Sequence, residues 1–324
     1  MAKLQSIEMV GVANRPATIC SNTMCIWFDT TNLKTVISYC GYGNFTGAWS
    51  TGGSVITARQ GLAGAGTQNV GLAFGNFNTG CTEEYDGTSW ATGGTLITFR
   101  RFLAGAGTQN EGLAAGGQIF NGTPTNWVAC TEEYNGTSWS VGGALATARY
   151  NLAGAGTQNV GLATGGCASY VVLSCTEEYN GTSWSTGGVL IIARRALAGA
   201  GTQNVGLATG GFGNTTTVCS SNEEYNGTSW STGGGLITAR RNLAGAGTQN
   251  EGLVFGGTIV NDFSALTEEY NGTSWSAGGA LITGRRGLAG AGSQSSGLAI
   301  SGFAGGDRSC TEEYNKIGII DTIQ

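Results

Sequence analysis

The residues most able to do chemistry in this 324-residue chain are pairs of adjacent glutamates, each followed by a tyrosine. The phrase EEY begins at Glu83, Glu132, Glu177, Glu223, Glu268 and Glu312. Two carboxylates can serve as the acid and the base of a glycosidase. Neighbouring residues of a strand point to opposite faces, however, so Glu132 and Glu133 cannot converge on one substrate. We therefore interpret the pairs as structural.

An arginine occupies one phase of the same repeat and is a suitable partner for a carboxylate. The six copies are Arg59, Arg100, Arg149, Arg194, Arg240 and Arg285. A charge-assisted hydrogen bond between arginine and glutamate in each repeat explains both residues without catalysis. We expect these arginines to have a structural role.

Other catalytic and metal-binding chemistry has few candidates in this chain. Histidine is absent, which excludes histidine acid–base catalysis, histidine-paired nucleophiles and histidine metal ligands. The nine cysteines include no CxxC pair, so we expect no zinc site. Cys167 and Cys175 flank one loop and either pair in an oxidising medium or stay reduced. We expect no catalytic residue, no metal and no cofactor.

Charge and hydropathy also argue against a nucleic-acid-binding, membrane-spanning or secreted protein. The net charge is −5 without basic runs, so a nucleic-acid partner is not expected. No stretch approaches the roughly 20 apolar residues of a membrane span. The first 20 residues lack a continuous apolar region, so we expect no secretory signal.

Three phrases recur in fixed order with a period of about 45 residues. They are LAGAGTQN, GLAxGG and EEYNGTSW, with small variations. Glycine at every second or third position disfavours helix by about 1 kcal/mol each, so strands are expected. The NG pair predicts a hairpin with a two-residue type I′ turn. Four short strands in each of six repeats predict the blades of a β-propeller, with the AGAG strands innermost.

A dinucleotide-binding loop is the competing interpretation of the glycines. It requires a helix after the glycines, and none is predicted. We therefore assign the small side chains of AGAG to crowding at the axis of the ring.

The repeat also resembles a known family. A diglycine after an apolar strand, then a tyrosine, a tryptophan and an arginine, as in GLATGG…TEEYNGTSWSTGGVLIIARR, is similar to the kelch pattern. The resemblance covers residues 45–314 and implies an all-β, six-bladed kelch-like β-propeller. Kelch-like propellers include a copper radical oxidase, but that chemistry needs histidine ligands. Sialidase-type propellers need converging arginines, whereas the arginines here are evenly spread, so we expect no enzyme.

The last repeat stops after Tyr314, and the segment FTGAWSTGG at residues 45–53 resembles the missing strand. We predict that the strand around Trp49 completes the last blade and closes the ring, which removes two exposed sheet edges. The predicted divisions are an N-terminal anchor or packing segment (1–44), the propeller (45–315) and a C-terminal tail (316–324).

The repeated aromatic residues are expected to pack between blades, where each buried ring contributes a few kcal/mol. The tyrosines are those of the EEY phrases. The tryptophans are Trp49, Trp90, Trp139, Trp184, Trp230 and Trp275.

The connections between the second and third predicted strands differ from repeat to repeat and are the candidate binding surface. A rigid scaffold with divergent loops is typical of binding proteins. The candidate residues are Phe77, Phe120, Trp127, Tyr170, Phe212, Asp262, Phe263 and Phe303. These aromatics suit a glycan or protein of a host surface. The alternative is that the loops are weakly constrained and contact nothing.

Residues 27–50, WFDTTNLKTVISYCGYGNFTGAWS, resemble a module of tailed-phage virion proteins. The glycine-rich repeats are also similar to predicted phage structural proteins. Asp29 stands where asparagine is usual, and the stretch before the tryptophan is lengthened. The resemblance implies a non-enzymatic virion protein, assembled in the host cytoplasm, for host attachment or virion decoration. Residues 1–44 and 316–324 would contact other virion proteins or a second copy. The alternative is a cellular kelch-type protein-interaction module.

Overall fold

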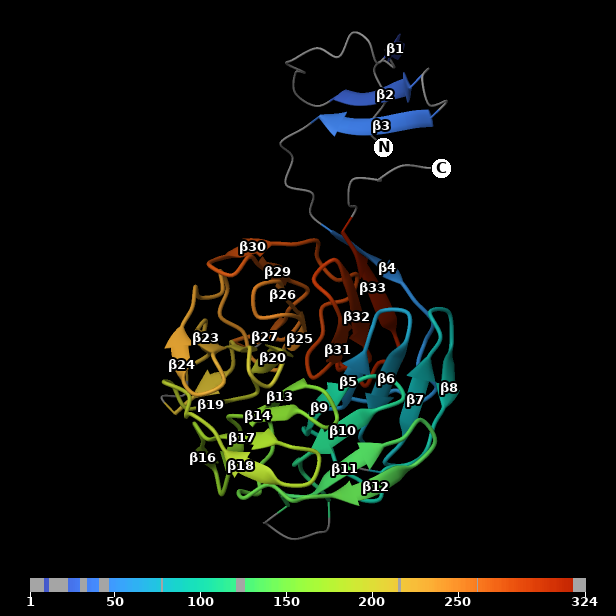
Figure 1. Ribbon diagram of the computed structural model, residues 1–324. Coiled ribbons are helices and arrows are strands. Elements are labelled where there is room, and N and C mark those ends of the chain that lie inside the picture. The colour runs from blue at the N-terminus through green and yellow to red at the C-terminus, as the bar shows by residue number, and fades with distance from the viewer. Residues whose placement is uncertain are drawn as a thin grey trace. The chain divides into compact units, whose positions relative to one another are not determined.

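The computed structural model describes residues 9–11, 23–29, 34–40, 47–76, 78–120, 126–214, 217–260 and 262–316. The chain divides into two compact units, one of residues 48–315 and one of residues 1–47 with 316–324. Residues 48–315 form six four-stranded sheets in a ring, a six-bladed β-propeller (Figure 1). The expected all-β propeller is therefore confirmed. In the described ranges every element is a strand, and no helix reaches the length and hydropathy of a membrane span.

Each blade is an antiparallel sheet whose first strand lies at the centre of the ring. Blade 1 contains β5 (Ala63–Gly66), β6 (Gly71–Phe74), β7 (Thr82–Tyr85) and β8 (Trp90–Thr92). Blade 2 contains β9 (Ala104–Gly107), β10 (Gly112–Ala115), β11 (Thr131–Tyr134) and β12 (Trp139–Gly142). Blade 3 contains β13 (Ala153–Gly156), β14 (Gly161–Thr164), β17 (Thr176–Tyr179) and β18 (Trp184–Thr186).

The remaining blades repeat this order. Blade 4 contains β20 (Ala198–Gly201), β21 (Gly206–Thr209), β23 (Asn222–Tyr225) and β24 (Trp230–Thr232). Blade 5 contains β25 (Ala244–Gly247), β26 (Gly252–Phe255), β29 (Thr267–Tyr270) and β30 (Trp275–Ala277). Blade 6 contains β31 (Ala289–Gly292), β32 (Ser296–Ile300), β33 (Thr311–Asn315) and β4 (Ala48–Thr51).

Blade 6 is built from both ends of the repeat array. Strand β4 pairs antiparallel with β33, and Trp49 lies opposite Tyr314. The predicted closure by an N-terminal strand is present, although residues 45 and 46 of that segment lie outside the described residues. The ring is also tied between blades 6 and 1, where Gln68 Nε2 donates to Tyr314 O at 2.7 Å.

The other unit contains a small three-stranded sheet. Strand β1 (Met9–Gly11) pairs parallel with β2 (Thr23–Asp29), which pairs antiparallel with β3 (Lys34–Cys40). The role of this segment as an anchor stays a prediction. Residues 317–324 of the tail lie outside the described residues.

Close approach at the axis explains the glycines of the inner strands. A Cβ placed on Gly199 would lie 2.5 Å from Gly154 O, and one on Gly154 would lie 2.6 Å from Gly105 O. Carbon and oxygen do not approach this closely, so only glycine fits. The alanines of β20, which alternate with these glycines, are buried against the next blade.

The repeated tyrosines and tryptophans pack between blades, as predicted. Tyr134 and Trp139 of blade 2 share a core cluster with Leu72 and Phe74 of blade 1. Tyr134 Oη donates to Glu84 Oε1 at 2.6 Å in the preceding blade. The same tyrosine–glutamate bond recurs from blade to blade and closes the ring between Tyr85 and Glu313.

The predicted hairpin at each NG pair is present, but the type I′ turn is wrong. Tyr134 pairs with Trp139, which leaves a four-residue loop, and Gly136 has φ +85° while Asn135 has no positive φ. Asn135 Oδ1 accepts hydrogen bonds from the N–H groups of Thr137 and Ser138, at 3.0 and 2.9 Å. The side chain thus satisfies the loop's amides, which favours the longer loop.

We expect Gly199→Ala to destabilise the propeller by about 1–3 kcal/mol, because the new methyl group overlaps the neighbouring inner strand. Denaturant unfolding measures the change. Gly306→Ala is the matched control, since no atom lies within 4 Å of its Cβ position and its φ is not positive. Equal stability of the two variants would contradict the close approach.

The inter-blade tyrosines predict a loss of stability in alkali. Burial and the hydrogen bond to Glu84 raise the pKa of Tyr134 from 10.0 to about 12. Since the folded pKa lies above the unfolded one, this stabilisation is complete below pH 10 and is lost as pH rises through about 12. The urea midpoint should fall over this interval, and less steeply in Tyr134→Phe. A urea midpoint that does not change over this pH interval would disprove the link between tyrosine ionisation and stability.

Candidate functional site

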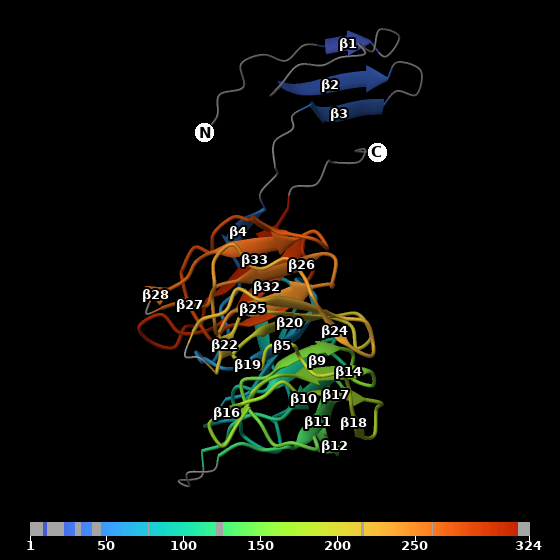
Figure 2. The same cartoon turned by 90° about the vertical axis from the view of Figure 1, so that its left-hand side faces the viewer.

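The two faces of the propeller carry different kinds of connection. The short turns between the first and second strands and between the third and fourth strands share one face. The opposite face, here called the loop face, carries two kinds of segment. The connections join the second and third strands of each blade and comprise residues 75–81, 116–130, 165–175, 210–221, 256–266 and 301–310. The linkers lead from one blade into the next and comprise residues 52–62, 93–103, 143–152, 187–197, 233–243 and 278–288. Figure 2 shows the labels β16, β19, β22, β27 and β28, which belong to these segments, on one side of the ring.

Short strand pairs join linkers to connections on the loop face. Strand β19 (Arg194–Arg195) of one linker pairs with β22 (Phe212–Gly213) of the next connection. Two connections also fold on themselves, through β15 (Cys167–Ala168) with β16 (Val171–Val172) and β27 (Thr258–Ile259) with β28 (Asp262–Phe263). The connections are therefore held by strand pairing either to the linkers or within themselves.

A buried ion pair fixes each linker. In blade 5, Arg240 Nη2 lies 2.8 Å from Glu268 Oε1, and Arg240 Nη1 donates to Leu266 O at 2.6 Å. Glu268 Oε2 accepts from Ile237 N at 2.7 Å, so the carboxylate holds the linker backbone as well. The predicted arginine–glutamate bond is present in all six blades: Arg59–Glu83, Arg100–Glu132, Arg149–Glu177, Arg194–Glu223, Arg240–Glu268 and Arg285–Glu312.

The residue two positions after each buried arginine forms a closed backbone ring at the axis. Asn242 N donates to Ala196 O at 2.8 Å, and Ala196 N donates to Asn151 O at 2.8 Å. The ring continues through Phe102 and closes where Gly61 N donates to Gly287 O at 2.7 Å. The four non-glycine members, Phe102, Asn151, Ala196 and Asn242, have φ of 54–55°. Such a strained conformation persists only where the surroundings impose it.

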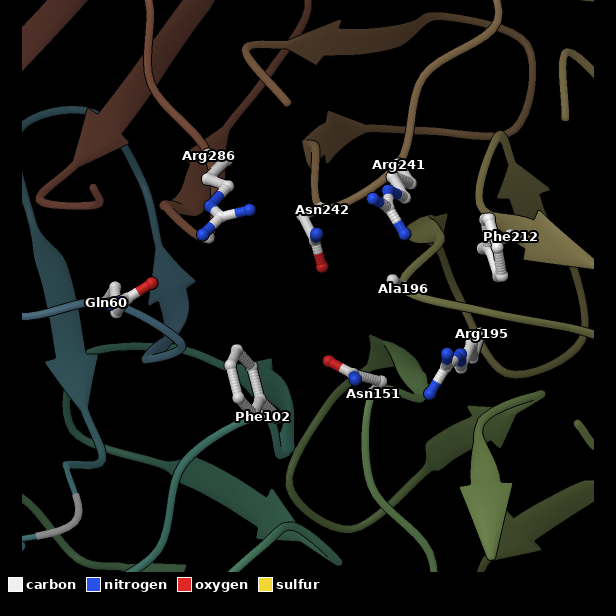
Figure 3. A pocket seen from close by; sticks show the side chains of 10 residues that line it. Gln60, Phe102, Asn151, Arg195, Ala196, Phe212, Arg241, Asn242 and Arg286 are labelled. Atoms are coloured by element: carbon white, nitrogen blue, oxygen red, sulfur yellow. The ribbon is translucent and has the colours of Figure 1, made fainter. Parts of the chain in front are cut away.

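This ring borders a cavity at the centre of the loop face, here called the mouth. The cavity measures about 210 Å³ and is lined by Gln60, Phe102, Asn151, Arg195, Ala196, Phe212, Arg241, Asn242, Arg286 and Gly287. Figure 3 shows Arg195, Arg241 and Arg286 arranged around this space with the amides of Asn151 and Asn242. The three arginines come from the linkers that lead into blades 4, 5 and 6.

The mouth concentrates positive charge in a chain whose net charge is −5. Burial lowers the pKa of the Arg241 guanidinium, and the positive charges of Arg195 and Arg286 lower it further. The guanidinium nevertheless stays charged in proteins. None of the ion pairs among the described residues includes any of these three arginines.

The aromatics predicted as the binding surface lie on the loop face, mostly outside the mouth. Phe120, Tyr170 and Phe263 are exposed by 75%, 81% and 38%. Asp262 is also exposed, whereas Phe77 lies outside the described residues. Trp127, Phe212 and Phe303 are half-buried, and Phe212 alone of the seven described residues lines the cavity.

The structure brings several of these aromatics together. Trp127 and Tyr170 have ring centroids 6.4 Å apart, and Phe263 and Phe303 have centroids 5.6 Å apart. The guanidinium of Arg286 lies 5.6 and 5.3 Å from the rings of Phe263 and Phe303. The aromatic surface and the cationic mouth are therefore continuous on this side of the ring.

Exposed apolar side chains also gather on the loop face. Of the eighteen large hydrophobic residues exposed in the described ranges, fourteen lie on its connections and linkers. They include Ile97, Val171, Ile237 and Ile282, each more than half exposed. Apolar surface gathered on one face is typical of an interaction site.

The arginines of the mouth were not predicted from the sequence. An even spread of arginine around the ring holds for the buried residues but is wrong for Arg195, Arg241 and Arg286, which converge. The available signal was the Arg-Arg doublet, which occurs at residues 100–101, 194–195, 240–241 and 285–286, although Arg101 of the first doublet is not among the residues that line the cavity. The first arginine of each doublet recurs in every repeat, whereas the second gives way to glutamine at Gln60 and tyrosine at Tyr150.

Comparisons with known proteins bear on the fold. No known protein family matches the sequence, and no curated protein matches it. A solved structure titled "Structure of YjhT" is similar, with a TM-score of 0.68 and 12% identity. The alignment covers 81% of this chain and 96% of that chain. At this identity the likeness shows the fold alone. The fold and the site together define the class of this protein as a six-bladed β-propeller with a cationic mouth.

We expect Arg240→Gln to destabilise the protein by about 3–5 kcal/mol, because Glu268 is left as a buried, uncompensated charge. The double variant Arg240→Gln/Glu268→Gln should recover part of this loss. Denaturant unfolding tests both variants, with exposed Arg308→Gln as the control for loss of an arginine. A double variant less stable than Arg240→Gln would contradict the pairing.

Proposed function

We propose that this protein is a non-enzymatic binding module that presents its loop face to a glycan or protein on a surface. The observation that carries the proposal is the concentration of exposed aromatic and aliphatic side chains on that face. The turn face carries only three exposed large hydrophobic residues in the described ranges, Val70, Val160 and Val205. Buried, rigid strands below the loops hold this surface in place.

The chemistry of the mouth supports a non-enzymatic role. Its lining residues include no carboxylate among those described, so no general acid or base faces the cavity. Tyr150, near the mouth, has its pKa raised by burial and by Cys167, which disfavours the phenolate needed for nucleophilic attack. In the described ranges, no three cysteine, aspartate or glutamate residues are placed to hold a metal ion.

The finer proposal is that the module belongs to a tailed-phage virion and is a kelch-type propeller. Two resemblances support it: the repeat is similar to the kelch pattern, and residues 27–50 are similar to a virion module. Residues 1–44 and 316–324 would then attach the propeller to other virion proteins. The loop face would be left available for the host surface.

Mass spectrometry of purified phage particles that encode this chain tests the virion role. The chain should copurify with the particles through a density gradient at a fixed ratio to the capsid protein. Its absence from particles, together with its presence in the infected or host cell, would instead support a cellular interaction module.

The loop-face proposal predicts that aromatic substitutions abolish binding. The triple variant Phe120→Ala/Tyr170→Ala/Phe263→Ala should lose at least about tenfold in binding, since exposed aromatic anchors dominate such interfaces. Binding is measured on an array of bacterial surface glycans and on isolated host cell envelopes.

The control for this experiment is the triple variant Val70→Ser/Val160→Ser/Val205→Ser on the turn face. It removes exposed apolar side chains without touching the loop face and should bind as the unmodified chain does. Thermal unfolding checks that both variants remain folded. Equal binding by the aromatic variant and the unmodified chain would rule out the loop face as the binding surface.

A further inference from the structure

The mouth gathers the positive charges of Arg195, Arg241 and Arg286. Each buried arginine of the blades meets a glutamate, but no ion pair among the described residues reaches Arg195, Arg241 or Arg286. Arg241 Nε is buried and has no hydrogen-bond partner in the described part of the chain. Arg195 contacts neutral groups there, the phenol of Tyr150 and, through Nη1 at 3.9 Å, the Sγ atom of Cys167. Three half-buried cations that repel one another are unfavourable unless something offsets their charge.

We propose that the mouth is a binding site for a small oxyanion, a carboxylate or phosphate group, held by Arg195, Arg241 and Arg286. Guanidinium groups match both anions, because their planar forks donate two parallel hydrogen bonds. The proposal concerns the centre of the ring and does not depend on whether the outer loops bind a partner.

The arginines are held in place before any ligand arrives. Each follows directly after a buried arginine that is paired with glutamate, and each precedes a member of the backbone ring. Aromatic faces support the guanidinium groups: Arg241 lies 4.7 Å and Arg195 5.5 Å from the Phe212 ring centroid. A site prepared in this way loses little conformational freedom on binding.

The cavity sets the size and chemistry of the ligand. Its volume of about 210 Å³ is below the roughly 300–1,000 Å³ of sites for drug-sized molecules. The anionic group is therefore the main part of what enters. Around it, the amides of Gln60, Asn151 and Asn242 offer donors and acceptors for neighbouring hydroxyl groups. A compact acidic unit that carries hydroxyls fits these groups better than an apolar acid.

The test titrates the full-length protein with three probes at low salt: inorganic phosphate, glucuronate and neutral glucose. Isothermal titration calorimetry measures affinity, and NMR follows the arginine Nε–H resonances. We expect saturable binding of phosphate or glucuronate, no binding of glucose, and weakening in 0.5 M NaCl because salt screens the charges. The anion that binds with the higher affinity identifies the ligand chemistry as phosphate or carboxylate.

Single substitutions localise the site. Arg241→Gln and, separately, Arg286→Gln should each weaken anion binding at least tenfold. Arg308→Gln is the matched control, because Arg308 lies on the loop face and does not line the cavity, and it should change affinity by less than twofold. Circular dichroism and thermal unfolding confirm that the variants are folded, and two separate mouth variants guard against misfolding of one.

Two results would overturn the proposal. One is the absence of saturable binding by both phosphate and glucuronate. The other is an equal loss in Arg308→Gln and the mouth variants, which would indicate a diffuse charge effect. Because these probes need no macromolecular partner, failure here leaves the aromatic-surface experiment unaffected, and the converse also holds.

Discussion

The buried arginine–glutamate pair is the interaction on which the rest of this propeller depends. A charge removed from water must meet an opposite charge and satisfy its remaining hydrogen bonds, and few arrangements meet both conditions. In blade 5, Glu268 does so by binding Arg240 and the backbone of the linker at Ile237. The pair therefore determines the path by which one blade leads into the next.

The second constraint is crowding at the axis, and it acts with the first. The inner strands approach until Gly199 and Gly154 leave no room for a side chain, and this allows the linkers to meet in a continuous backbone ring. Closure by β4 makes the network of inter-blade bonds circular, so that Tyr85 finds Glu313 as its partner. Pairing of β4 with β33 also covers two strand edges that could otherwise pair with other chains.

Structural residues and residues of the proposed binding site alternate along the same short linkers. Arg240 is invariant within the repeats and buried, while Arg241 beside it varies between repeats and faces the mouth. The rigid residue positions the variable one, so the scaffold tolerates change at the mouth and in the loops without loss of the blade. This arrangement is consistent with a binding protein whose surface diversifies on a constant frame.

The sequence by itself determined the repeat, the strands, the number of blades and the closing strand at Trp49, because these follow from local pattern and from counting copies. It also determined the pairing of Arg240 with Glu268, since both occupy fixed phases. It did not determine the loop at Asn135, where side-chain bonds to the backbone replace the shorter turn. Only the tertiary structure brought Arg195, Arg241 and Arg286 together, because they lie in different repeats and meet only when the ring closes around its axis.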